Sequence, residues 1–451
     1  MKASIHKHIR FSTLHSKPFI TFCLILLLTF LSIFPVHATT TGYVPEIVAP
    51  RAVLMDAETG TVLFSKNAGE LTFPASTTKV LTALVVLEHA SLDDVVAIDY
   101  EPGVTGSSMY IVPGEAFTVE TLLKGLLIRS ANDAAEILAR HVSGSVEAFV
   151  ALMNQHAAAI GAVNTHFTNP HGLPDENHVT TAYDLALISR EAMKNDFFRE
   201  VVASPSLVIA PTSETEQRVY NNSNRFLWGK GPSHQMIYQG NYTNIYYEPV
   251  DGIKTGYTHS ARNCLISSAV FNNDRYIAVV LNAEQESIYA DSRTLLDYGF
   301  QFFHRIHLVE NGSQLAMMPV MGGDSEAVAL VADTTLQQIV PRNVLPSDVR
   351  MELLLPEEDL AAPLAQNEIL GQVQYFYEDE LLGQANLITQ NAIEEVPPIF
   401  QQISWGFYGP AALIVLFILW QVFVFYLRQK KRKQRRMQRA RRYQQYESLN
   451  S

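Results

Sequence analysis

The 451-residue sequence predicts an α/β (α+β) domain, followed by a small all-β domain and a C-terminal transmembrane helix. Three observations carry this prediction. Between residues 51 and 305, strand-like runs are interspersed with apolar residues at helical spacing. From about residue 307, short β runs separated by prolines and acidic turns take over. The apolar run 410–427 is long enough to span a bilayer.

The first 38 residues are predicted to be a signal peptide. Four basic residues precede the apolar run 19–34, and Val36-His37-Ala38 offers the small residues that a signal peptidase needs. We therefore expect export, with cleavage after Ala38. An uncleaved N-terminal anchor is the alternative.

The C-terminal apolar run is flanked by aromatic residues before it and basic residues after it. Trp405, Phe407 and Tyr408 would lie at the membrane interface, and residues 428–451 hold ten Lys and Arg against the single acidic residue Glu447. The positive-inside rule explains this tail without a nucleic-acid partner. The sequence predicts a linker at 393–407, a spanning helix at 408–427, a cytoplasmic tail at 428–451, and a body anchored to the outer side of the cell membrane.

Net charge and cysteine content argue against two functional classes, nucleic-acid binding and thiol chemistry. The formal net charge is −12, but the signal peptide carries +4 and the tail +9, so residues 39–427 carry −25. Nucleic acid is therefore an improbable partner for the exported body. Cys23 leaves with the signal peptide, and Cys264 is predicted to be a small core residue of a strand rather than a reactive thiol.

The predicted elements of the first domain follow one another from a hairpin to a final helix. Periodicity and turn residues predict strands at 52–56, 61–66, 250–258, 264–270 and 276–281, and helices from about 76 to 89 and at 119–128, 133–144, 146–160, 182–194 and 290–300. Residues 200–249 are rich in Asn, Tyr and Ser, and their periodicity is too weak to predict an element.

The small β-rich domain is predicted at residues 307–392. Its strand-like runs are 313–319, 327–331, 349–355, 370–376 and 381–388. Roughly ninety residues suit a single module.

Ser76 and Lys79 form the first candidate catalytic pair. They stand three residues apart at the start of an apolar helical run, so both side chains lie on one face near the positive end of the helix dipole. A desolvated Lys near a second cation loses its proton and can act as a base. The same pattern occurs at Ser4 and Lys7 in the signal peptide, so the pair alone is equally consistent with a helix-start serine and a solvated lysine.

Two further motifs follow in order along the chain. Ser130-Ala131-Asn132 falls at a predicted helix–helix junction, and Lys254-Thr255-Gly256 falls in a predicted strand. The set S-x-x-K, S-x-N and K-T-G is typical of penicillin-binding proteins and class A β-lactamases. Ser448-Leu449-Asn450 in the tail also matches S-x-N, so a single motif is weak evidence. The prediction depends on finding all three motifs in the expected order and in the expected helix-start, helix-junction and strand positions.

The chain resembles the low-molecular-weight penicillin-binding proteins that are serine-type D-alanyl-D-alanine carboxypeptidases. The segments that carry the resemblance, beyond the three motifs, are 73–79 (Phe-Pro-Ala-Ser-Thr-Thr-Lys), 169–173 (Asn-Pro-His-Gly-Leu), 181–186 (Thr-Ala-Tyr-Asp-Leu-Ala) and 250–256 (Val-Asp-Gly-Ile-Lys-Thr-Gly). The resemblance implies a penicillin-binding/β-lactamase-like transpeptidase domain at residues 39–306, with an antiparallel sheet flanked by helices, and no cofactor. Tyr257 stands where some relatives carry His, and the tether is a spanning rather than an amphipathic helix.

The resemblance also implies a role for each motif residue. Ser76 would attack the carbonyl of the penultimate D-Ala, Lys79 would take its proton, and Ser130 would relay a proton to the leaving amine. Asn132 would hold the substrate amide. Lys254 and Thr255 would receive the terminal carboxylate, and Gly256 is expected to take part in substrate binding. The backbone N–H groups of Ser76 and Tyr257 would stabilise the oxyanion. The expected partners are peptidoglycan stem peptides ending in D-Ala-D-Ala and β-lactam antibiotics.

Three alternative functions stay open from sequence. A β-lactamase would need a deacylating base, and no Glu stands in a loop like that of the class A enzymes. A penicillin-binding sensor or wall-binding module would need a signalling domain, and the tail is short. His171, Asp175, Glu176 and His178 have the look of metal ligands, but we expect a structural loop and no metal, since the serine set already accounts for catalysis.

Overall fold

The computed structural model describes residues 42–285, 287–396 and 405–447. The chain divides into two compact units. One comprises the chain up to Leu308 together with Leu336–Arg350 and Tyr375–Gly383, and the other comprises Val309–Thr335, Met351–Gln374 and the chain from Gln384 on. The predicted signal peptide lies outside the described residues. The predicted domain boundaries, 39–306 and 307–392, stay predictions.

A five-stranded antiparallel sheet forms the centre of the first unit, in the order β2-β1-β11-β10-β9. Its strands are β1 (Arg51–Asp56), β2 (Val62–Lys66), β9 (Val250–Thr258), β10 (Arg262–Phe271) and β11 (Asp274–Ala283). All five were predicted. The β1–β2 turn forms because Asp56 accepts hydrogen bonds from the backbone and hydroxyl of Thr59, and Gly60 takes a positive φ of +79°.

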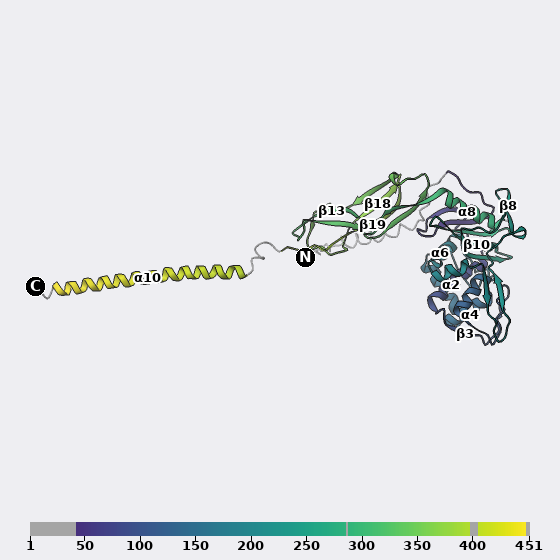
Figure 1. Cartoon of the computed structure of the whole chain (residues 1–451), viewed down its shortest axis with the longest axis horizontal. Helices are drawn as coiled ribbons and strands as arrows, with labels where there is room; N and C mark the ends of the chain where they lie inside the picture. The colour runs from purple at the N-terminus through teal and green to yellow at the C-terminus, as the bar shows by residue number, and fades with distance from the viewer. Residues whose placement is uncertain (1–41, 286, 397–404, 448–451) are drawn as a thin grey trace, which may run out of the picture. The chain divides into compact units, whose positions relative to one another are not determined.

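Both faces of this sheet are buried. Because side chains alternate along a strand, Val53, Met55 and Val279 pack on one face and Leu54 and Val280 on the other. The first face is covered by α2, α4 and α6, and the second by α8, as Figure 1 shows around β10. Burial on both faces explains the nearly continuous apolar runs of β1 and β11.

The predicted helices are present with small shifts at their ends. They are α2 (Lys79–His89), α3 (Val119–Lys124) with its π-helical continuation η2 (Gly125–Arg129), α4 (Asn132–Ser143), α5 (Val146–Ala159), α6 (Ala182–Ala192) and α8 (Ile288–Phe302). Side-chain oxygens of Thr118, Ser145 and Thr181 cap the first turns of α3, α5 and α6.

The segment with weak periodicity folds into short elements. They are α7 (Asp196–Ala203), the hairpins β5 (Ser206–Ile209) with β6 (Arg218–Asn221) and β7 (Gln235–Tyr238) with β8 (Asn241–Asn244), and the turns η3 (Arg225–Leu227) and η4 (Pro232–His234). A short pair, β3 (Val95–Ala97) and β4 (Ala116–Thr118), precedes α3. Four-residue strands are too short for alternation to reveal them.

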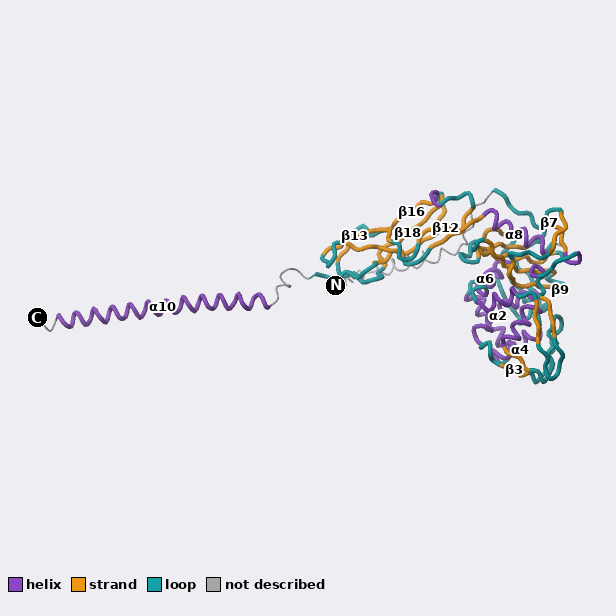
Figure 2. Tube along the Cα trace, in the orientation of Figure 1, coloured by secondary structure: helices purple, strands orange, loops and turns teal. Residues whose placement is uncertain are grey.

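All five predicted β runs beyond residue 307 are strands. A six-stranded sheet has the order β16-β18-β19-β14-β13-β17. Figure 2 shows the strands of this part of the chain in orange. Its strands are β13 (Gln314–Met321), β14 (Ala327–Ala332), β16 (Val349–Leu354), β17 (Leu360–Ala361), β18 (Ile369–Tyr377) and β19 (Glu380–Thr389). The unpredicted pair β12 (Phe303–Val309) and β15 (Leu336–Pro341) forms a separate ladder, and η5 (Pro346–Asp348) precedes β16.

The C-terminal apolar run forms one helix with the basic tail. Helix α10 extends over Trp405–Glu447, and its segment Gly409–Arg442 is long and apolar enough to cross a membrane. Its apolar side chains are exposed: Phe417, Leu419 and Phe423 are each more than half accessible. Such a surface requires a lipid or protein environment.

Candidate active site

Ser76 lies in a 3-10 turn, η1 (Ala75–Thr78), directly before α2. The sequence predicted the first turn of the helix itself, and the structure places Ser76 in the turn that leads into it. Two hydroxyls tighten this turn, because Thr77 donates to the Pro74 carbonyl (2.7 Å) and Thr78 to the Ala75 carbonyl (2.9 Å). Ala75 has a left-handed φ of +48°, which is rare for a residue with a Cβ atom.

Lys79 is fully buried and reaches back to Ser76. Its Nζ lies 3.0 Å from Ser76 Oγ, 2.7 Å from Asn132 Oδ1 and 2.5 Å from the His171 carbonyl oxygen. Burial lowers the pKa of Lys79 well below its usual value, the positive charge of Lys254 lowers it further, and Asp133 opposes both. A neutral amine is therefore favoured beside the hydroxyl, which is the state that a general base needs.

Ser130 and Asn132 lie at the predicted helix–helix junction. Ser130 ends the π-helical turn η2 with a left-handed φ of +65°, and Asn132 is the first residue of α4. The Asn132 amide is oriented by two partners, since its Oδ1 accepts from Lys79 and its Nδ2 donates to the Thr105 carbonyl (2.6 Å). The structure thus connects the first two motifs by direct hydrogen bonds.

The third motif lies on β9, at the edge of the sheet next to η1. Lys254 is fully buried, its Nζ donates to the Thr255 carbonyl (3.0 Å), and burial lowers its pKa to about 7. The Thr255 hydroxyl donates to Ser223 Oγ (2.7 Å). A Cβ atom on Gly256 would stand 3.1 Å from the Ser76 nitrogen and from the Pro74 oxygen, so glycine permits this close approach.

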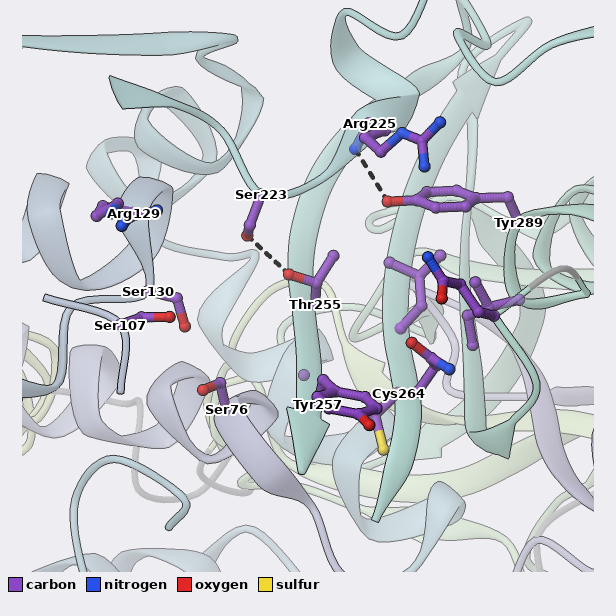
Figure 3. A pocket seen from close by; sticks show the side chains of 15 residues that line it. Ser76, Ser107, Arg129, Ser130, Ser223, Arg225, Thr255, Tyr257, Cys264 and Tyr289 are labelled. Atoms are coloured by element: carbon purple, nitrogen blue, oxygen red, sulfur yellow. Dashed lines mark hydrogen bonds between the residues drawn. The ribbon is translucent and has the colours of Figure 1, made fainter. Parts of the chain in front are cut away.

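A cleft of about 370 Å³ opens over these residues. The predicted residues that line it are Ser76, Ser130, Thr255, Gly256 and Tyr257, as Figure 3 shows for the side chains. Lys79, Asn132 and Lys254 are buried in the protein beside them. The Tyr257 side chain is 65% exposed, so its ring borders the cleft without being packed into the core.

Several lining residues were not predicted from sequence. Ser107, Arg129, Ser223, Arg225 and Tyr289 all face the cleft. Ser223 and Arg225 come from the segment 200–249, where neither periodicity nor a motif offered a signal. Arg129 directly precedes Ser130 and could have been singled out by that neighbourhood.

The two histidines considered as metal ligands take part in hydrogen bonds within the protein. His178 Nδ1 accepts from the Thr168 backbone N–H (3.0 Å), and its Nε2 lies 2.8 Å from Thr78 Oγ1. Burial lowers the pKa of His178 to about 4 and that of His171 to about 3. Among the described residues, no group of three or more His, Cys, Asp or Glu side chains could hold a metal ion.

Cys264 is buried on β10, as predicted. Burial raises the pKa of its thiol to about 11, which disfavours the reactive thiolate.

Two protein-family models match this chain, one over its N-terminal part and one over the β-rich part that follows. The family model described as D-alanyl-D-alanine carboxypeptidase matches residues 38–285, and the model for the C-terminal domain of penicillin-binding protein 5 matches residues 303–395.

Individual relatives agree with the family models. The D-alanyl-D-alanine carboxypeptidase DacF of Bacillus subtilis is 31% identical over 75% of this chain and 84% of its own length. DacC of Escherichia coli is 32% identical over 79% of this chain and 87% of its own length. The crystal structure of penicillin-binding protein 5 from Haemophilus influenzae aligns with a TM-score of 0.66 at 29% identity, covering 78% of this chain and 99% of that one.

Proposed function

The chain belongs to the D-alanyl-D-alanine carboxypeptidase family, and we propose that it removes the terminal D-alanine of peptidoglycan pentapeptides through an acyl-enzyme on Ser76. One observation supports this assignment most strongly. The buried Lys79 amine lies 3.0 Å from Ser76 Oγ, in surroundings that disfavour its protonation. A serine beside a neutral amine is an activated nucleophile.

Acylation begins when Ser76 Oγ attacks the carbonyl carbon of the penultimate D-alanine. Lys79 takes the hydroxyl proton, and Ser130 passes a proton to the leaving amine. Asn132 holds the amide of the substrate, since its own amide is already oriented by Lys79 and Thr105. These are roles for groups that touch the reacting atoms, and each follows from its donor or acceptor chemistry.

Charge develops on the carbonyl oxygen during this attack. The backbone N–H groups of Ser76 and Tyr257 would stabilise it, and the close approach of Gly256 to the Ser76 nitrogen supports this pairing of η1 with β9. Lys254 and Thr255 receive the terminal carboxylate. A carboxylate beside Lys254 favours its charged form, so substrate binding raises a pKa that burial alone lowers to about 7.

Water then hydrolyses the ester and restores Ser76. β-Lactams contain an amide that resembles the D-Ala-D-Ala bond, so they acylate the same serine. A β-lactamase would have to remove that acyl group rapidly, and no described feature of the cleft favours this activity.

Labelling with a fluorescent penicillin, combined with D-alanine release from a pentapeptide ending in D-Ala-D-Ala, tests the proposal. Both signals should be present in the wild-type protein and lost in Ser76→Ala. A Ser4→Ala variant removes the serine of the second S-x-x-K pattern and should retain both. D-Alanine release that survives in Ser76→Ala would refute the assignment.

The proposed location combines export with a membrane anchor. The signal peptide at residues 1–38 would direct the body across the membrane, and α10 would hold it there with the basic tail in the cytoplasm. The catalytic unit would then face the peptidoglycan. Reaction of Ser448→Cys with a membrane-impermeant thiol reagent in intact cells would contradict this orientation.

A further inference from the structure

Arg225 lines the active-site cleft, and the reaction proposed above assigns it no role. It makes no ion pair with any described carboxylate, and its buried Nε has no hydrogen-bond partner among the described residues. The exported body carries a net charge of −25. A guanidinium in the cleft wall, with no ion pair to the described acidic groups, has the chemistry to bind an external anion.

The position of Arg225 is set by its neighbours. Its backbone N–H donates to the Tyr289 hydroxyl (3.1 Å), and its guanidinium carbon lies 5.8 Å from the centre of the Tyr289 ring. The Asn224 side chain accepts a hydrogen bond from the Phe226 backbone N–H (3.1 Å). This bond caps the turn η3, whose first residue is Arg225. Figure 3 shows Arg225 and Tyr289 at the end of the cleft away from Ser76.

A second cavity, of about 380 Å³, continues from this end of the cleft. The two cavities share Arg225, Gln285 and Tyr289. The remaining lining residues of the second cavity belong to the β7–β8 hairpin and its approach: Gln235, Met236, Ile237, Tyr242 and Ile245. Ile237 and Tyr242 are largely exposed, so the hairpin offers an apolar wall next to a cation.

The order of residues along β9 indicates which part of a substrate would reach Arg225. Gly256 lies against the Ser76 nitrogen, and the preceding Thr255 donates to Ser223, two residues before Arg225. The terminal carboxylate belongs to the leaving residue and is proposed to bind at Thr255. The leaving residue is therefore the part of the substrate next to the segment that contains Ser223 and Arg225.

We propose that Arg225 and the β7–β8 hairpin form a subsite for the side chain of the leaving residue, selective for an acidic side chain. This inference rests on the proposed carboxypeptidase function and extends it to peptides of the form acyl-D-Ala-D-Xaa in which Xaa carries a second carboxylate. Guanidinium–carboxylate pairs of this kind are charge-assisted and geometrically specific. Longer leaving groups would extend along the hairpin.

The chemistry of the step is unchanged. Ser76 Oγ forms an ester with the D-Ala carbonyl, the C–N bond breaks, and the amine of D-Xaa leaves with the proton relayed to it. Water then cleaves the ester. Arg225 acts only on the binding of D-Xaa, so it changes the ratio of rates between leaving residues.

Hydrolysis of four peptides that differ only in the leaving residue tests the subsite. The residues are D-Ala, D-Gln, D-Glu and the one-carbon-longer D-2-aminoadipate, and the free amino acid released is measured. We expect kcat/KM to be about tenfold higher for an acidic residue than for D-Gln. Arg225→Gln should bring this ratio to about one, and Arg225→Lys should retain part of it.

Lys230→Gln provides the control, because Lys230 is an exposed cation of the same segment that lines neither cavity. It should keep the wild-type ratio. Equal rates for D-Glu, D-2-aminoadipate and D-Gln in the wild type would overturn the subsite, as would a ratio that survives in Arg225→Gln. Absence of release from the D-Ala peptide would instead refute the carboxypeptidase assignment. Melting temperatures of the variants separate misfolding from lost selectivity.

Discussion

The turn that contains Ser76 packs closely against a glycine of a distant loop. Gly172 has a positive φ of +86°, and a Cβ atom placed on it would stand 1.8 Å from the Ala75 carbonyl oxygen and 3.0 Å from the Ser76 nitrogen. Ala75 itself is in the left-handed region. The turn that contains Ser76 therefore depends on the absence of a side chain at Gly172, 96 positions further along the sequence.

Gly172→Ala should consequently displace the Ser76 turn. We expect the free energy of unfolding to fall by more than about 2 kcal/mol, because a backbone clash cannot be relieved by rotating a side chain. Penicillin labelling should fall as well. Gly144→Ala is the matched control, since Gly144 also has a positive φ (+75°) but has nothing within 4 Å of its Cβ position. It should lose about 1 kcal/mol and label normally; equal losses in both variants would contradict the explanation.

The two buried lysines make acylation depend on pH. In the proposed mechanism the active form of Lys79 is the neutral amine, so acylation should be lost as pH falls through the pKa of Lys79. That pKa is lowered first by burial and then by Lys254. Lys254→Gln removes the second cause, so the acidic limb of the profile should move to higher pH, whatever the loss in overall rate from weaker carboxylate binding.

Penicillin acylation rates measured between pH 5 and 10 would test this shift. Lys230→Gln, which removes a charge on the surface, should leave the limb in place. A limb that stays unmoved in Lys254→Gln would show that Lys254 does not influence the ionisation of Lys79.

The loop between α5 and α6 supports η1 through hydrogen bonds between the two elements. It is joined by the bridges Thr72–Thr180 and His166–Val179, and His178 connects it to Thr78. Because His178 Nδ1 accepts from the Thr168 N–H, its proton is on Nε2, which donates to Thr78 Oγ1. Thr78 in turn donates to the Ala75 carbonyl next to the nucleophile.

This network should make the fold sensitive to acid. The pKa of His178 is about 4 in the folded protein and about 6.5 when unfolded. The unfolded chain therefore binds more protons between these values, and stability is lost as pH falls from about 6.5 towards 4. Each such proton changes the slope by about 1.4 kcal/mol per pH unit.

His178→Gln should flatten this slope, because Gln offers a donor and an acceptor but does not titrate. Denaturant unfolding at several pH values between 7 and 4.5 measures it. His166→Gln, at an exposed histidine of the same loop, should keep the wild-type slope. A wild-type slope in His178→Gln would disprove the linkage.

Attachment to the membrane is a property of the whole molecule. Helix α10 has exposed apolar side chains over its first half and basic residues over its second half. The β strands end at Thr389, and the bridge Gly323–Glu395 extends the ordered contacts of the second unit to within a few residues of the undescribed segment 397–404. The described residues that line the cleft all lie between Ser76 and Tyr289.

A chain ending after Val396 should therefore be soluble and active. We expect it in the soluble fraction of the exported protein, with D-alanine release from a pentapeptide within about twofold of the full-length enzyme; the full chain should fractionate with membranes. Full-length protein in the soluble fraction, or truncated protein that stays with membranes, would contradict α10 as the anchor.

Local sequence patterns determined most of the elements and the reaction. The three motifs predicted Ser76, Lys79, Ser130, Asn132 and Lys254 as site residues, and the turn, helix junction and strand that contain them are short-range features. The hairpin β1–β2 and the runs that became β13 and β14 likewise follow from alternation and turn residues alone. These patterns concern residues a few positions apart, so the sequence reveals them directly.

Only the tertiary structure decided how these pieces meet. The contacts of Lys79 with Asn132 and with the His171 carbonyl join residues 53 and 92 positions apart, and no spacing rule encodes them. Arg225 reaches the cleft from a segment without periodicity, and His178 contacts Thr78 in the turn that contains Ser76. The physical reason is that burial and charge around a side chain depend on which distant segments pack against it.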